Sequence, residues 1–132
     1  MKSLLLLLAA LLPPSVLAQE DDRALGKRLA RCAAVLTYVQ AAPTSFKLGI
    51  SKEDAKTVGQ LALVETYTLL GEEFGRAEIK ENMTTFRAEL DQTPPAELGS
   101  KLKTEGEPCA ELAISKFAEL KSRMAAPAVK KQ

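Results

Sequence analysis

Cys32 and Cys109 are the two cysteines of this 132-residue chain, and sulfur is the first chemistry that its sequence offers. Two cysteines in an oxidising compartment usually form one structural disulfide, whereas a redox-active pair is normally spaced as Cys-x-x-Cys. These two lie 77 residues apart, so we predict a structural disulfide and keep a redox pair as the alternative. Closing a loop of this length stabilises a fold by about 4.5 kcal/mol through chain entropy.

Histidine is missing from the sequence altogether, and its absence excludes several classes of site. Serine or cysteine nucleophiles activated by an imidazole, the usual zinc sites, covalent haem attachment and Glu-x-x-His di-iron sites all need it. There is also no glycine-rich phosphate loop. The glutamates around residues 72–81 lack the spacing of a calcium loop. We therefore predict no metal, no cofactor and a non-enzymatic role, with carboxylate or lysine catalysis as a minor alternative.

Glu65 is the acidic residue whose position is most unusual. It lies seven residues after Val58 and four before Leu69, so helical spacing places it inside an apolar stripe. A carboxylate there must be paired, hydrated or raised in pKa. Three interpretations follow: a structural ion pair or a position at the rim, contact with a ligand or partner, and a catalytic acid. Possible ion-pair partners are Arg28, which flanks the apolar stripe of the first predicted helix, and Arg76 and Arg87, which flank that of the third.

The helix that carries Glu65 is apolar almost all round. Its leucines, valine and tyrosine cover more than one face, and such a helix is either central in the bundle or in contact with a partner. The partner interpretation assigns Leu63, Tyr67 and Leu70, on the side opposite Val58, to a homodimer or a protein-binding surface. With Glu65, these are the candidate binding residues.

The elements that must position these residues are predicted to be helices. Alanine, leucine, glutamate and lysine are abundant, aromatic residues make up 5% and tryptophan is absent, a composition that favours helix over strand. Apolar residues recur every three or four positions in four segments, near 21–42, 51–70, 76–91 and 108–124. We place a packed loop at 44–50, a weak helical turn at 98–102 and a polar loop at 104–107, and we put Cys109 in the first turn of the last helix. The predicted fold is all-α, a small four-helix bundle-like domain with one disulfide joining helix 1 to the last helix.

Residues 1–18 are predicted to be a cleaved signal peptide, since Lys2 precedes an apolar run that prolines and then small residues end. Cleavage near Ala18-Gln19 leaves a single helical domain at 19–124 and a disordered tail at 125–132. The leader contains one of the 18 basic residues and none of the 17 acidic ones, so the mature chain would be neutral. Because the mature chain would be neutral, we predict no nucleic-acid binding. Because no later segment is apolar enough to span a bilayer, we predict no stable membrane insertion. We expect the protein to be periplasmic or secreted.

In size, helical content and its two cysteines, the chain resembles small exported bacterial helical proteins with one disulfide, such as the acid-stress periplasmic chaperones of the HdeA type. We hypothesise a binding protein that acts on another protein in the periplasm, as an inhibitor, an immunity factor or a chaperone. The alternative is a small-molecule or lipid carrier that uses an apolar cavity inside the bundle.

Overall fold

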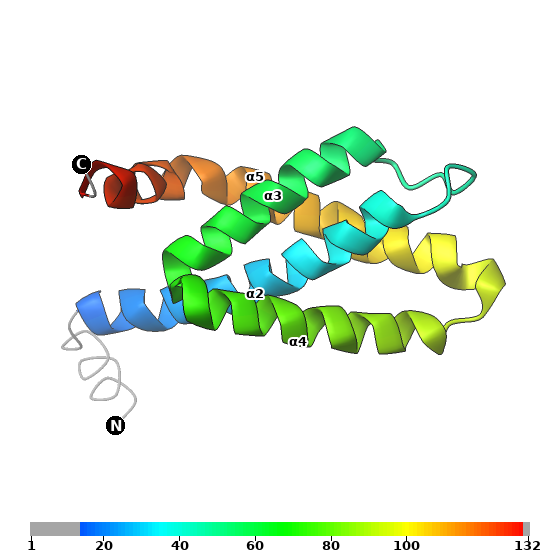
Figure 1. Ribbon diagram of the computed structural model, residues 1–132, viewed down its shortest axis with the longest axis horizontal. Coiled ribbons are helices and arrows are strands. Elements are labelled where there is room, and N and C mark those ends of the chain that lie inside the picture. Colours follow the sequence, from blue (N-terminus) through cyan, green and yellow to red (C-terminus); the bar gives the residue numbers. More distant parts are fainter. Residues whose placement is uncertain (1–13, 131–132) are drawn as a thin grey trace, which may run out of the picture.

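The computed structural model describes residues 14–130, and the side chains of residues 22–124. Over this range the chain is helical, with no β-strand, which confirms the all-α prediction. The elements are α2 (Pro14–Ala41), α3 (Lys52–Leu70), α4 (Glu72–Asp91), the short 3₁₀ turn η1 (Pro95–Glu97) and α5 (Leu98–Lys130). Figure 1 shows α3 and α4 as a helical hairpin laid across α2 and α5.

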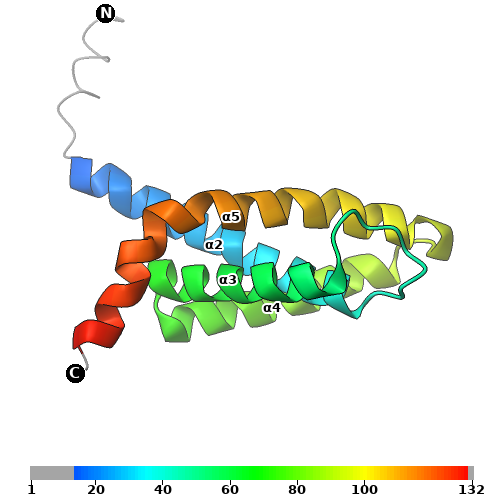
Figure 2. The same cartoon turned by 90° about the horizontal axis from the view of Figure 1, so that it is seen from above.

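Helix α2 is the centre of the bundle and is antiparallel to two of its neighbours. A side chain at Gly26 would meet Leu69 and Leu70, near the end of α3, and Gly59 near its start lies beside Leu36. Towards α5, α2 is tied by the Cys32–Cys109 disulfide. Figure 2 shows α2 enclosed between α5 and the α3–α4 hairpin.

The core is built on a wide buried face of α2 and is rich in alanine. Small side chains let helix axes approach closely, and this brings apolar surface out of water at about 25 cal/mol per Å². The larger fully buried apolar side chains are Leu29, Val35, Leu36, Val39 and Phe86. The buried alanines are Ala30, Ala33, Ala34, Ala42, Ala55, Ala62, Ala110 and Ala113.

The start of α2 differs from the prediction. The helix begins at Pro14 and not near residue 21. Proline is tolerated at the first helical position, where its missing N–H would have no partner, and the following Val, Leu, Ala, Gln and Glu residues do not interrupt a helix. Asp22 pairs with Arg123 of α5 at 3.0 Å. The first 13 residues of the predicted leader lie outside the described residues.

The start of α3 agrees with the prediction, whereas α4 is longer than predicted. The hydroxyl of Ser51 accepts a hydrogen bond from the Asp54 N–H at 3.0 Å and caps α3. A single residue, Gly71, joins α3 to α4 with a φ of 83°, a conformation that favours glycine. Helix α4 therefore starts at Glu72, four residues before the predicted start near Arg76. Gly75 does not break it, because this glycine is buried against Tyr67.

Helix α5 is one continuous helix, so the predicted polar loop at 104–107 is wrong. Pro108 lies in its interior, and Cys109 lies mid-helix and not in a first turn. Interior proline removes one backbone hydrogen bond. Packing along α2 offsets this loss, since Gly106 is buried against Val39 and Cys109 is bonded to Cys32. The backbone stays helical to Lys130, beyond the predicted end near Met124, and residues 131–132 lie outside the described part.

No helix within the described residues has a stretch that is both long enough and apolar enough to cross a bilayer.

Candidate functional site

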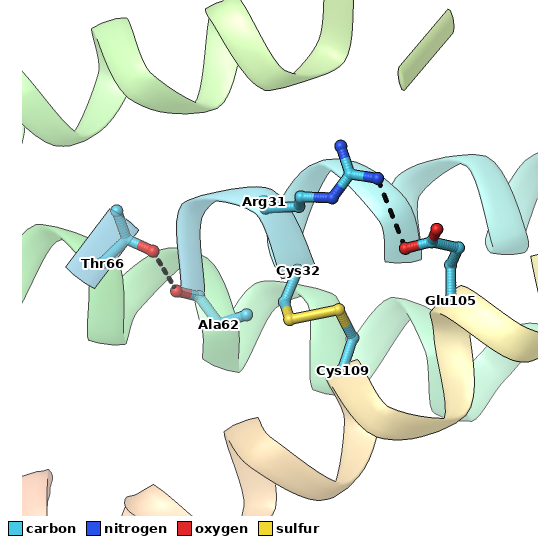
Figure 3. The surroundings of a disulfide bond; sticks show 6 residues. All are labelled: Arg31, Cys32, Ala62, Thr66, Glu105 and Cys109. Atoms are coloured by element: carbon cyan, nitrogen blue, oxygen red, sulfur yellow. Dashed lines mark hydrogen bonds and ion pairs between the residues drawn. A yellow bond between two sulfur atoms is a disulfide. The ribbon is translucent and has the colours of Figure 1, made fainter. Parts of the chain in front are cut away.

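The predicted disulfide between Cys32 and Cys109 is confirmed. Their Cα atoms are 4.9 Å apart, within the range that the bond requires. Both cysteines are buried, and Figure 3 shows the bond linking α2 to α5, with Ala62 and Thr66 of α3 nearby. Burial shields the sulfur atoms from solvent, so the geometry is that of a structural bond.

A network of four charged side chains includes two cations that lie beside the ring of Phe86. Arg31 donates to both carboxylate oxygens of Glu89 at 3.1 and 3.2 Å and to Glu105 at 3.3 Å. Lys101 bridges the same two glutamates at 3.1 and 3.5 Å. The Arg31 guanidinium and the Lys101 ammonium lie 5.2 and 5.8 Å from the Phe86 ring centroid. These contacts join α2, α4 and α5.

The hydrogen bonds of this network shift the pKa values of two of its members so that their charged forms are favoured. The hydrogen bond from Arg31 lowers the pKa of Glu89, and the same bond raises the pKa of Arg31. Sequence reasoning missed this cluster, since its partners are 58 and 74 residues apart and share no motif. All four side chains are partly exposed, and their ion pairs hold three helices together.

Glu65 lies on the buried side of α3, as the apolar stripe indicated, and of the interpretations made from the sequence the structure shows neither an ion pair nor a position at the rim. Its exposed fraction is 0%, and neither carboxylate oxygen has a hydrogen-bond partner. Arg76, one of the three arginines proposed as partners, instead pairs with Glu72 on its own helix. Desolvation by burial raises the pKa of Glu65 to about 7, which favours the neutral acid at mildly acidic pH.

Leu63, Tyr67 and Leu70 are half-buried and lie apart from Glu65 on α3. At 100° per residue, Tyr67 is about 160° round the helix from Glu65. Tyr67 lies against Gly75 of α4, and Leu70 lies against Gly26 of α2. The structure therefore uses these side chains largely for packing within the chain, and only the edge of this surface reaches solvent.

An open groove lies between residues 22–27 of α2, the end of α3 and the start of α4. It has a volume of about 420 Å³. Its apolar part is formed by Leu69, Leu70 and Phe74, and its charged rim by Asp22, Arg23, Lys27 and Glu78. Of the predicted candidate residues, only Leu70 lines it.

Phe74 is the most exposed large apolar side chain of the described residues, at 71%. The sequence reasoning missed it, because a single phenylalanine within Glu72–Gly75 belongs to no apolar stripe. An aromatic residue placed against the helical pattern was the available signal. Within the described residues, no cluster of acidic side chains or cysteines could hold a metal ion.

The groove and the buried Glu65 are thus the two features that packing alone does not explain. Comparisons with known proteins found no matching family model, no similar curated protein and no similar solved structure.

Proposed function

We propose that this chain is an exported, non-enzymatic protein that binds another protein through the groove at the α2–α3–α4 end. The observation that supports the proposal is Phe74, an aromatic side chain 71% exposed beside an apolar hollow. Large exposed aromatic residues are unfavourable in water and are enriched at protein interfaces, where they act as anchors.

The composition of the groove suggests the kind of partner segment. Its apolar part would receive one or two apolar side chains of a partner, with a polar rim that excludes water. On the α2 side, Arg23 and Lys27 are cationic, whereas Asp22 is already paired with Arg123. A partner segment with an acidic residue next to its apolar anchor therefore fits best, since opposite charges improve both selectivity and the association rate.

Site-specific photocrosslinking tests this proposal. We expect a photoreactive phenylalanine at position 74 to give one discrete protein adduct in the native compartment. The same probe at Ile114 of α5, which is 59% exposed and does not line the groove, is the matched control and should give no such adduct. Mass spectrometry of the adduct would identify the crosslinked peptide and show whether it carries the apolar and acidic residues.

The dissociation constant for the identified partner, measured for wild type and for variants of the groove, tests the proposal quantitatively. Phe74→Ala should weaken binding at least 30-fold, as expected for an anchor residue worth about 2 kcal/mol or more. Ile114→Ala should leave binding within about twofold. Identical adducts at both positions, or a second copy of this chain as the crosslinked species, would contradict the proposed partner.

Export is the second part of the proposal, and a buried oxidised disulfide supports it, because such bonds persist mainly outside the reducing cytosol. We predict that the protein recovered from its native compartment begins at Gln19. Intact mass spectrometry after cell fractionation measures this directly. Ala18→Phe should block processing, since a large residue is not accepted at the cleavage site. A wild-type chain that keeps Met1 and remains in the cytosol would refute export.

A further inference from the structure

Helix α3 is attached to the rest of the bundle differently from the other helices. Within residues 22–124, each side-chain hydrogen bond or ion pair between helices connects two of the three helices α2, α4 and α5, and none involves α3. Those bonds involve the Arg31 network, the Tyr38 hydroxyl donating to the Met83 carbonyl, and the Arg123–Asp22 pair. The disulfide also joins α2 to α5. The side-chain hydrogen bonds of α3 all stay within the helix or its cap. Side-chain packing is therefore what holds α3 against its neighbours.

Glu65 lies in that packed contact. The approaches of Gly26 to Leu69 and of Gly59 to Leu36 set the register of α3 on α2, and this register places Glu65 opposite the region of Ala30. Ala30 is itself fully buried, as is Ala62 one turn before Glu65. The two unpaired carboxyl oxygens thus face an apolar helix contact, in which a charged carboxylate is strongly disfavoured.

Charged side chains on the neighbouring helices do not relieve this carboxyl. On α2 the charged residues nearest in register are Arg31, which is bonded to Glu89 and Glu105, Arg28, which is exposed, and Lys27, which lines the open groove. On α5 the residues at the level of the disulfide include Glu111, which is exposed, and Lys116, which pairs with Glu119. On α4 Arg76 pairs with Glu72, while Glu78 and Lys80 line surface hollows. None of these groups donates to either oxygen of Glu65.

We propose that α3 is a proton-controlled latch: it stays docked on α2 and α5 while Glu65 is protonated, and it is released when Glu65 loses its proton. The linkers at each end permit this movement, since residues 42–51 form an irregular connection and Gly71 provides a turn with positive φ. The disulfide and the Arg31 network keep α2, α4 and α5 together when α3 leaves. This inference does not depend on the proposed partner groove.

The direction of the pH effect follows from the two states of Glu65. In the docked state the pKa is about 7, whereas the carboxyl of a released helix returns towards 4.5. The released state binds fewer protons between these values, so docking is strongest below pH 4.5 and is lost as pH rises through 7. One proton changes the equilibrium by up to tenfold per pH unit, so the release constant should rise roughly 300-fold in all, of which roughly 100-fold falls between pH 4.5 and 7.5.

Glu89 has the opposite pH dependence and can be separated from this effect. The hydrogen bond from Arg31 lowers its pKa, so its contribution is present above the unfolded pKa and is lost as pH falls. Acid therefore weakens the network of α2, α4 and α5 while it favours the docking of α3. A measurement that resolves individual helices distinguishes the two groups.

Native-state hydrogen exchange of the oxidised full-length chain from pH 4.5 to 7.5 is the test. Protection factors, which are corrected for the intrinsic pH dependence of exchange, should fall roughly 100-fold for amides 61–69 of α3. Amides 29–36 of α2 and 109–120 of α5, which are exposed only by global unfolding, should stay more strongly protected than those of α3 at every pH. Protection of α3 that does not change with pH would overturn the latch, and so would equal protection in all helices, which indicates that α3 opens only by global unfolding.

Variants assign the effect to Glu65. Glu65→Leu removes the buried carboxyl and should make α3 protection independent of pH; Glu65→Gln, which keeps the shape and cannot ionise, serves the same purpose if the leucine variant fails to fold. Glu111→Gln, at an exposed position of α5, is the matched control and should keep the wild-type slope. A wild-type slope in the folded Glu65 variants would show that another group controls α3.

Discussion

Replacing Cys32 and Cys109 together by alanine should lower the free energy of unfolding by about 4.5 kcal/mol, because the 77-residue loop between them is no longer closed in the unfolded chain. Alanine is the suitable replacement, since both positions are buried in a core that already contains many alanines. For a domain of this size the change corresponds to a fall of roughly 15–20 °C in the melting temperature. Thermal unfolding followed by circular dichroism at constant pH measures it.

The single variant Cys109→Ala separates the covalent bond from the thiol that it leaves behind. It should be destabilised to within about 1 kcal/mol of the double variant, because either change opens the same loop. Thiol labelling of the unfolded wild-type protein without reductant should find no free cysteine. A double variant that melts within 3 °C of wild type would show that the disulfide has little part in the stability of the bundle.

Phe86→Ala should also be strongly destabilising, by about 4 kcal/mol, the usual range for deleting a buried phenylalanine ring. Phe86 is 0% exposed, and its ring centroid lies 5.7 Å from that of Tyr38. The ring also carries two cations, Arg31 and Lys101, whose attraction to its face adds to the loss of buried area. Denaturant unfolding at a fixed pH gives the change in free energy.

Phe74→Ala is the control for this prediction, since it deletes the same side chain at a position that is 71% exposed. It should change the free energy of unfolding by no more than about 0.5 kcal/mol, the usual limit at surface positions. Phe86→Leu should be milder than Phe86→Ala, because an apolar side chain still fills much of the space. Equal effects of Phe74→Ala and Phe86→Ala would contradict the assignment of Phe86 to the core.

The two predicted losses of stability, from removing the disulfide and from removing the Phe86 ring, concern the same part of the molecule. The disulfide and the Phe86 network connect α2, α4 and α5, whereas α3 has neither a covalent nor an ionic tie to them within the described residues. Stability is then unevenly distributed, as is common where one element opens before the rest unfolds. Helix α3 carries both Glu65 and part of the groove, and it is the helix that we propose to be released as pH rises.

Local sequence signals predicted the features that depend on neighbours in the chain. Ser51 was predicted to start α3, and it caps that helix, because a hydroxyl reaches an N–H three residues on with no outside help. The apolar stripe also predicted that Glu65 lies on an inward face, which its 0% exposure confirms. Predicted boundaries were less accurate: the helices expected to begin near 76 and 108 begin at Glu72 and Leu98, and so include Gly75 and Pro108. These residues disfavour helix locally, but both lie inside helices because of contacts with other elements.

By itself, the sequence determined the helical class, the periodic buried faces and the pairing of the two cysteines, since composition, helical period and a count of two suffice for each. Only the tertiary structure decided which charges meet. Arg31 joins Glu89 and Glu105 across 58 and 74 residues, and no arginine reaches Glu65. The reason is physical: helical spacing defines which face a residue occupies, but the helix that covers that face is set by the packing of the whole bundle. Exposure of Phe74 and the groove beside it arise in the same way, from the turn at Gly71 that brings α4 against the ends of α2 and α3.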